Sequence, residues 1–246
     1  MPQAGEILLT AVSYNIHQCV GTDGRCDPER VAAVIREMNA DVVGLQEIDF
    51  NPRGEKKSHQ LDFLVEATGM NAIAGQTIRR VEAEFGNALL TRCEVSTVRL
   101  HDISVARRQP RGVIDAEVAF KGKIVRVLVT HLGLAINERR RQAESLLRML
   151  NEPEKNYDFT LMIGDINEWR HWGFATYSLD AYFGRLPSPR SFPSFFPVFS
   201  LDRIWVTPTT ALQEIRIANN GLARVASDHL PVVATVNLSE PRPISF

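Results

Sequence analysis

Five apolar runs in this chain each border on a small group of polar residues. These groups are Asn15, Gln46-Glu47, His131, Gly164-Asp165-Ile166-Asn167 and Ser227-Asp228-His229. Apolar runs of this length are typical of buried β-strands, and polar side chains at their ends are typical of one site formed where several strands converge. The pattern predicts an α/β domain of layered sheets and helices, with the layout of an enzyme.

The length and composition predict one soluble domain. At 246 residues with 44% hydrophobic content, and with no stretch that resembles a linker, we expect a single domain over residues 1–246. No stretch approaches the roughly 20 apolar residues that span a bilayer, and a signal sequence is lacking, so we expect no transmembrane segment and a cytoplasmic location. Cys19, Cys26 and Cys93 fit reduced thiols, although Cys19 and Cys26 could pair under oxidation.

The net charge of −1 and the pI near 6.6 argue against a protein that coats nucleic acid through bulk electrostatics. Arginines are nevertheless clustered locally, at Arg79-Arg80, Arg107-Arg108, Arg111 and Arg139-Arg140-Arg141. Such clusters can serve a phosphate site without making the whole protein basic. For Arg139 to Arg141 we prefer a solvated helix face.

A strand-helix-strand unit is predicted near the N-terminus. Residues 6–15 and 41–48 are typical of strands, and the helix between them begins at Pro28 after the N-cap Asp27. A right-handed crossover between parallel strands places their C-terminal ends on the same edge of the sheet. Asn15 and Glu47 should therefore be neighbours.

The remaining elements follow from periodicity and turn residues. We expect helices from Ser58 to about Thr68, ended by Gly69, and over 138–150; an antiparallel region of strands 87–92, 95–105, 113–120 and 123–131, with a hairpin at Lys121-Gly122-Lys123; and strands 158–164, 201–206, 212–218 and 230–238. Residues 168–200 are rich in aromatic residues, proline and serine. We predict that they form a long, ordered and functional loop.

Asp165 and Asn167 alternate across Ile166 at the end of an apolar run, so both side chains should point to the same side at roughly 7 Å spacing. The aspartate can accept a proton from water, and the asparagine can donate to a phosphoryl oxygen. A strand-ending Asx-turn explains the pattern equally well.

His229 needs a carboxylate partner if it takes part in catalysis, because such a partner fixes the tautomer and raises the basicity of the ring. Asp202, at the start of another strand, could supply it. The alternative is that Asp202 pairs with its neighbour Arg203.

Glu47 ends a nearly apolar strand, where an unpaired carboxylate is costly, so it should pair with a basic residue or bind a cation. Oxygen ligands from Glu47, with Asn15 and Asp228 nearby, suit Mg²⁺ or Mn²⁺. Zinc is disfavoured because the six histidines lack zinc-type spacing. Taken alone, His131 is best interpreted as a neutral histidine in the core. The other polar residues at strand ends favour a place for it in the site.

Seven motifs taken in order resemble the endonuclease/exonuclease/phosphatase superfamily, in a less characterised bacterial branch. They are Tyr14-Asn15-Ile16-His17, Leu45-Gln46-Glu47, Gly86-Asn87-Ala88-Leu89-Leu90, Thr130-His131-Leu132, Gly164-Asp165-Ile166-Asn167, Leu201-Asp202 and Ser227-Asp228-His229. The resemblance implies a four-layer α-β-β-α sandwich, with two mixed sheets face to face and helices outside. It also implies Mg²⁺-dependent hydrolysis of a phosphoester, with Mn²⁺ as a substitute.

The resemblance also implies roles for the site residues. They are metal binding for Glu47, with Asn15 close by and Asp228 at a second position; orientation of water by Asp165; phosphoryl contacts by Asn167 and His229; orientation of His229 by Asp202; a phosphate contact or acid role for His131; and substrate binding by Asn87. Apart from these motifs, Arg111 is well placed in the sequence for a further contact to the phosphate of the substrate. The expected partner is a phosphoester substrate.

Three functions compete. The first is a phosphodiesterase for a small or lipid-derived substrate, with aromatic residues that line a pocket or meet a lipid surface. The aromatic residues concerned are Trp169, Trp172, Phe174, Phe192, Phe195 and Phe196, and we expect at least half of them to be packed. The second is a nuclease that stacks bases on them, which the net charge does not favour. The third is a binding protein without catalysis.

Overall fold

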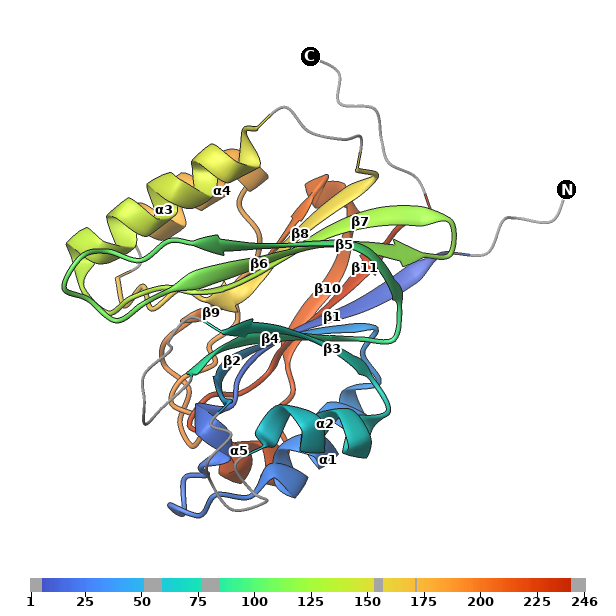
Figure 1. The fold of residues 1–246 in the computed structure, drawn as a ribbon, viewed down its shortest axis with the longest axis vertical. Coiled ribbons are helices and arrows are strands. Elements are labelled where there is room, and N and C mark those ends of the chain that lie inside the picture. The colour runs from blue at the N-terminus through green and yellow to red at the C-terminus, as the bar shows by residue number, and fades with distance from the viewer. Residues whose placement is uncertain (1–5, 51–58, 77–84, 153–156, 171, 240–246) are drawn as a thin grey trace, which may run out of the picture.

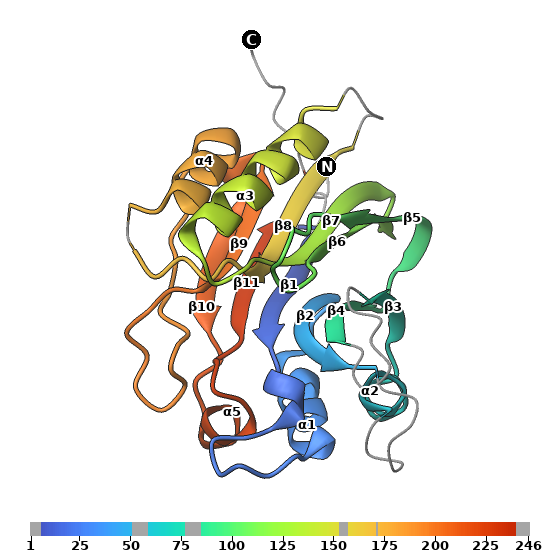
Figure 2. The same ribbon diagram turned by 60° about the vertical axis from the view of Figure 1, so that its left-hand side comes forward.

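Two mixed β-sheets pack face to face in the computed structural model, and helices cover their outer surfaces (Figures 1 and 2). The structure describes residues 6–50, 59–76, 85–152, 157–170 and 172–239. The predicted four-layer α-β-β-α sandwich is therefore confirmed. No described helix is long and apolar enough to cross a membrane.

One sheet has six strands and the other five. In spatial order the first contains β10 (Leu212–Ile217), β11 (Val232–Asn237), β1 (Leu8–Asn15), β2 (Val42–Asp49), β4 (Phe85–Thr91) and β3 (Asn71–Gln76). The second contains β5 (Glu94–Asp102), β6 (Gly112–Phe120), β7 (Lys123–His131), β8 (Phe159–Asp165) and β9 (Asp202–Thr207). Three helices cover the six-stranded sheet, namely α1 (Pro28–Met38), α2 (Gln60–Thr68) and α5 (Gly221–Ala226), whereas α3 (Ile136–Leu150) and α4 (Phe174–Phe183) cover the five-stranded sheet.

The main core lies between the sheets and consists of alternate aliphatic side chains from both. Gly44 of β2 lies where the sheets approach closely, since a Cβ atom there would be 2.7 Å from Cγ2 of Ile163 on β8. Any larger residue would push the sheets apart. This close approach matters because β2 and β8 both lead into the polar site.

The predicted strand-helix-strand unit is confirmed. Strands β1 and β2 are parallel, with Asn15 opposite Gln46, and α1 begins at Pro28 with the Asp27 side chain accepting from Arg30 N. The hairpin between β6 and β7 turns through Lys121 and Gly122, both with positive φ. This geometry is favoured in two-residue hairpin loops because it matches the twist of the strands.

The expectation of one long loop over 168–200 is wrong in its first half, because α4 occupies Phe174–Phe183. Ala175, Leu179 and Phe183 are spaced by four residues and bury one face of this helix. The aromatic composition hid that short pattern. Strand β3 and helix α5 were also not predicted, and Ser58, the expected start of the second helix, lies outside the described residues.

Candidate active site

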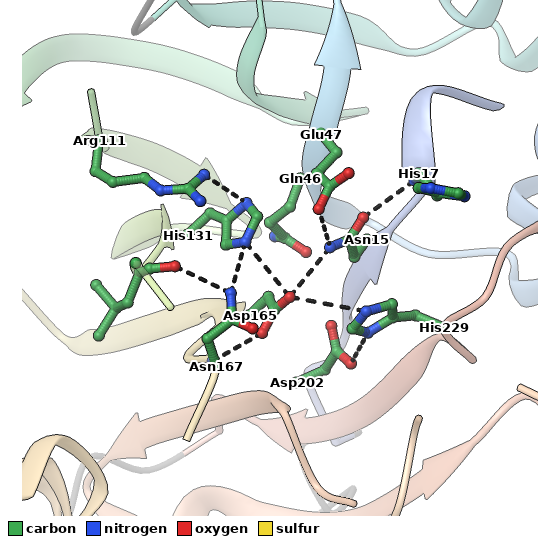
Figure 3. Close-up of polar contacts among 12 residues, drawn as sticks. Asn15, His17, Gln46, Glu47, Arg111, His131, Asp165, Asn167, Asp202 and His229 are labelled. Carbon is green, nitrogen blue, oxygen red and sulfur yellow. Dashed lines mark hydrogen bonds and ion pairs between the residues drawn. The ribbon is translucent and has the colours of Figure 1, made fainter. Parts of the chain in front are cut away.

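Polar side chains from both sheets meet at the C-terminal ends of β1, β7 and β8 (Figure 3). Asn15 joins the two sheets: its Nδ2 donates to Glu47 Oε1 and to Asp165 Oδ2, each at 3.1 Å. The prediction that Asn15 and Glu47 are neighbours is confirmed. The crossover from β1 to β2 therefore places Glu47 beside the Asn15 amide, and β8 of the facing sheet places Asp165 beside the same amide.

Glu47 owes its direction to an irregularity in β2. The pairing of β2 with β4 shifts between Leu45 and Ile48, and Glu47 has a φ of 58°, in the left-handed region. Residues other than glycine adopt this conformation at a cost, and bulges of this kind often redirect side chains at functional sites. The backbone here aims a carboxylate into the pocket.

Asp165 is the centre of the site. Its Oδ2 lies 3.5 Å from His131 Nε2 and 3.9 Å from His229 Nε2, and the carboxylate is buried. Burial and the nearby charge of Asp202 raise the pKa of Asp165 to about 6, against the opposing effects of His229 and Asn15. This carboxylate can therefore exchange a proton close to neutral pH.

Asp202 holds His229, as predicted. The distance from His229 Nδ1 to Asp202 Oδ2 is 2.7 Å, and Ser191 Oγ donates to the same oxygen. Burial lowers the pKa of His229, but Asp202 outweighs burial and raises the pKa to about 10, so the ring is an imidazolium at neutral pH. The alternative partner Arg203 instead donates to Ser200 O. Nothing in the sequence pointed to Ser191.

His131 lies between two donors. Arg111 Nη1 is 3.1 Å from its Nδ1, and Asn167 Nδ2 is 2.9 Å from its Nε2. Burial, with the charges of Arg111 and His229, lowers the pKa of His131 well below its usual value, so the ring is neutral. A neutral imidazole accepts at one nitrogen only, so one of the two donors is left for another acceptor.

Asn167 reaches the site by a different route from the predicted one. Strand β8 ends at Asp165, so the expected alternation along a strand is wrong. Asn167 has a φ of 52°, and its backbone N donates to Asp165 Oδ1 at 2.8 Å. The Asx-turn interpretation is thus correct, and the same turn brings the Asn167 side chain into the pocket.

The other predicted residues line the same pocket at its edges. Asp228 is partly exposed, with its Oδ1 3.9 Å from His17 Nδ1. Asn87 is buried and donates to Gly112 O. Arg111 brings its guanidinium to the pocket beside His131. All ten residues selected from the sequence therefore lie in or directly beside one pocket.

The donor atoms of the pocket fit a divalent cation. Asp165, Asp202 and His229 place possible ligand atoms within 4.8 Å of one another, but the protonated ring of His229 leaves the two carboxylates as the ligands of this group. Glu47 adds a third carboxylate, next to Asn15, and among the described residues no lysine or arginine pairs with Glu47. Carboxylates suit a hard cation. Asn15 turns its oxygen to His17 N at 3.0 Å, so as a ligand it would have to turn its amide over.

The pocket has a volume of about 390 Å³ and combines a polar floor with an aromatic wall. Phe192 packs against His229 with ring centroids 4.7 Å apart, and Trp169 meets Phe192 edge-on at 5.4 Å. The volume suits a ligand of moderate size. The lining also includes five residues that were not predicted from the sequence, namely Gln18, Phe85, Gln109, Gly112 and Leu134.

Arg139 corrects the prediction of a solvated arginine run. Its side chain is 3% exposed, and its Nη2 donates to Glu168 Oε1 at 3.1 Å. Its Nη1 donates to the carbonyl oxygens of Gly133 and Leu134. Arg139 therefore ties together the two loops that follow His131 and Asn167. Its helical phase, in line with Ala143 and Leu146, was the available signal.

We expect Arg139→Ala to lower the free energy of unfolding by about 3 kcal/mol, because it leaves the Glu168 carboxylate buried and unpaired. Arg140→Ala is the matched control. Arg140 is 60% exposed and pairs with Glu144, so its loss should cost less than about 1 kcal/mol. Urea denaturation of both variants measures the difference, and equal losses would contradict the structural role of Arg139.

Comparisons with known proteins place this chain in a family. The model described as "Endonuclease/Exonuclease/phosphatase family" matches residues 12–229. The uncharacterized protein YbhP of Escherichia coli (strain K12) is 30% identical over 256 residues, which cover 96% of this chain and 99% of YbhP.

Solved structures share the fold at lower identity. The endonuclease/exonuclease/phosphatase from Beutenbergia cavernae is 20% identical, with a TM-score of 0.77 over 97% of this chain and 73% of that one. Mannosyl-6-phosphatase Bt3783 of Bacteroides thetaiotaomicron is 18% identical, with a TM-score of 0.68 over 92% of this chain and 98% of that one. D. rerio TDP2, complexed with single strand DNA product, is 18% identical, with a TM-score of 0.69 over 94% of this chain and 99% of that one. The chain belongs to the endonuclease/exonuclease/phosphatase family.

Proposed function

We propose that this protein is a Mg²⁺-dependent phosphodiesterase, in which Asp165 orients a water molecule for in-line attack on phosphorus. Members of its family are phosphoester hydrolases, which supports the reaction class. The observation that carries the proposal is the position of Asp165, between the Asn15 amide and the imidazoles of His131 and His229. A carboxylate whose pKa is about 6 is suited to accept a proton from water near neutral pH.

The donors around Asp165 suit a phosphoryl group. A phosphodiester is anionic and gains further charge on its oxygens during attack, so fixed donors and cations aimed at those oxygens lower the barrier. His229 is an imidazolium at neutral pH, with Nε2 turned away from its partner Asp202. Arg111 adds a second cation on the other side of His131. We assign phosphoryl contacts to His229, Asn167 and Arg111, and a supporting contact to the neutral His131.

The donor chemistry of the pocket fits a divalent cation, and we assign Glu47 as its main ligand, with Asn15 nearby and Asp228 at a second position. When bound, Mg²⁺ or Mn²⁺ would neutralise charge on the phosphoryl oxygens and favour ionisation of water. The carboxylates of Glu47 and Asp165 both lie beside the Asn15 amide, so charge neutralisation between them would also relieve their mutual repulsion.

Hydrolysis of two chromogenic substrates tests the proposal. Bis(p-nitrophenyl) phosphate and p-nitrophenyl phosphate should be compared with Mg²⁺, with Mn²⁺ and with EDTA. The proposal expects cleavage of the diester that EDTA abolishes and Mg²⁺ restores. Diester cleavage that persists in EDTA would contradict it, and preferential cleavage of the monoester would reassign the enzyme as a phosphatase.

Glu47→Gln is expected to act mainly on the cation. Removal of the negative charge should raise the Mg²⁺ concentration for half-maximal activity by about tenfold or more, while turnover at saturating Mg²⁺ falls less, because Asp165 and His229 remain in place. A Mg²⁺ titration of the diesterase activity measures both quantities. The exposed Glu66→Gln on α2 is the control and should titrate like the wild type. An unchanged Mg²⁺ requirement in Glu47→Gln would remove Glu47 from the ligand set.

A nuclease is the second candidate function. It is favoured by the similarity in fold to TDP2, solved with single strand DNA product, and by Arg107 and Arg108 in the loop that reaches the pocket at Arg111. A nuclease that contacts several phosphates binds less tightly as salt rises. Binding of a single-stranded oligonucleotide that falls steeply with added salt would support this candidate, and a flat response would count against it.

A further inference from the structure

Large apolar side chains stand exposed around the mouth of the pocket. We use the name apolar rim for Leu134, Ile136, Trp169, Trp172, Phe195 and Phe196, which range from 40% to 88% exposed. The expectation that at least half of the six named aromatic residues are packed is therefore wrong, since five are exposed and Phe192 is only partly buried. Soluble proteins rarely gather exposed apolar side chains in this way without a binding role.

The rim residues lie in segments that also line the pocket. They come from three segments, 132–136, 168–173 and 184–201, and each segment also contributes to the pocket wall, through Leu134, Trp169 and Phe192 respectively. A fourth segment, 103–111, contributes Arg111 to the same wall. Whatever covers the rim therefore also covers the entrance to the site.

Phe195 and Phe196 are held out in solvent by a hydrogen-bonded base. Phe192 and Phe199 form an antiparallel bridge, with backbone bonds in both directions. Ser194 N donates to Asp228 O at 2.7 Å, and Ser194 Oγ donates to Arg224 O. The two phenylalanines at the tip are 68% and 69% exposed. The fold thus fixes two adjacent aromatic rings that the described residues leave about two-thirds exposed.

The same four segments carry a one-sided charge. Their exposed charged residues toward the pocket are Arg107, Arg108, Arg170 and Arg190, whereas Arg185 follows Gly184, which packs on Thr209 at the far end of β9. The single carboxylate in these segments, Glu168, is buried against Arg139. Aromatic and aliphatic side chains interspersed with cations are the composition of protein surfaces that sit in the headgroup region of anionic membranes.

The aliphatic members of the rim favour lipid over nucleic acid. Leu134 and Ile136 are 66% and 55% exposed, and such side chains offer no face on which a base can stack, whereas hydrocarbon accepts them readily. The local cations and the apolar side chains together match a negatively charged bilayer surface.

We infer that this face docks on membranes rich in anionic phospholipid, with the apolar rim in the headgroup region and the pocket mouth turned to the lipid phosphates. Docking itself is independent of catalysis. That the pocket then cleaves a phosphoester carried by the lipid rests on the proposed function. The inference names the bilayer surface as the partner and lipid phosphoesters as the substrate class.

Vesicle flotation in EDTA tests docking without turnover. The wild type should bind vesicles made of equal parts phosphatidylcholine and phosphatidylglycerol, and should bind phosphatidylcholine alone much more weakly. Phe195→Ser/Phe196→Ser should weaken binding by about tenfold or more. Arg107→Gln/Arg108→Gln should weaken it by about fivefold for each arginine lost. Equal binding to both kinds of vesicle, or binding by these variants like that of the wild type, would overturn the inference.

Two exposed positions away from the mouth provide matched controls. Ile124→Ser lies at the end of β7 opposite His131, and Arg216→Gln lies on β10. Both should bind vesicles like the wild type. All variants should cleave bis(p-nitrophenyl) phosphate like the wild type, which shows that they fold. Binding of a single-stranded oligonucleotide that Phe195→Ser/Phe196→Ser weakens, without vesicle binding, would overturn the inference in favour of nucleic acid.

Vesicle binding and diester cleavage can fail separately. A wild type that binds anionic vesicles but cleaves no diester supports docking and contradicts the proposed function. A wild type that cleaves the soluble diester but ignores anionic vesicles contradicts docking alone. If the wild type shows both activities, it should also cleave phosphatidylglycerol in mixed vesicles. A Phe195→Ser/Phe196→Ser variant that cleaves this lipid more slowly, but the soluble diester at the wild-type rate, supports lipid phosphoesters as the substrate class. If neither phosphatidylglycerol nor any of a panel of other phospholipids in such vesicles is cleaved, lipid phosphoesters are not the substrate class.

Discussion

Asp165→Asn is expected to reduce turnover of the diester by about 10⁴-fold with the fold intact, since positioned proton acceptors contribute up to about this factor. The carboxamide keeps the shape of the side chain but cannot take a proton from water. It also removes one carboxylate from the group formed with Asp202 and His229. Steady-state kinetics at saturating Mg²⁺ measures the loss.

The folded state of Asp165→Asn should be at least as stable as that of the wild type in EDTA. Burial and the charge of Asp202 raise the pKa of Asp165 to about 6, so its ionised form is unfavourable in the folded protein at neutral pH. Asp62→Asn, exposed on α2, removes the same charge elsewhere and should leave turnover unchanged. Near-full turnover by Asp165→Asn would remove Asp165 from the mechanism.

His229→Ala is expected to lower turnover by about 10³-fold, because it removes a cationic donor aimed at the phosphoryl oxygens. His59→Ala, an exposed histidine beside α2, is the control. The sign of the pH dependence follows from Asp202, which raises the pKa of His229 to about 10. The donor is therefore present through neutral pH and is lost as the pH rises through about 10.

Asp202→Asn removes the carboxylate that outweighs the effect of burial on the pKa of His229. Without this carboxylate, the pKa of His229 falls from about 10, because burial then opposes only the smaller effects of Asp165 and Asp228. The alkaline limb of the kcat/KM profile should then move down by several pH units, and activity at neutral pH should fall in the same variant. A limb that stays near pH 10 in Asp202→Asn would show that a group other than His229 sets it.

The sequence predicted most strands and the members of the site because both depend on short-range patterns, whereas the four layers were implied by the resemblance to the family. Apolar runs place strands, the crossover rule brings Asn15 next to Glu47, and the strand-start aspartate Asp202 finds His229. Two features depended on irregular backbone, which sequence patterns do not encode well. These are the bulge that aims Glu47 and the turn that redirects Asn167.

Other parts of the site depend on tertiary packing alone. Ser191 reaches Asp202 from a loop with no motif, and Gln18 joins the pocket only because the chain turns back after β1. Arg139 looked like a surface residue because arginine is seldom buried, and only its partner Glu168, in a loop far along the chain, explains it. Composition alone also could not tell exposed aromatic residues from packed ones.

The amide of Asn15 has a consequence for how ligands could be found. It donates hydrogen bonds to one carboxylate from each sheet, so the site links the two sheets directly. A ligand that binds there stabilises the native arrangement of both sheets at once, by an amount that grows with the logarithm of its concentration over its Kd. Melting temperatures recorded against a panel of phosphoesters in EDTA would therefore rank candidate substrates before any reaction product is known.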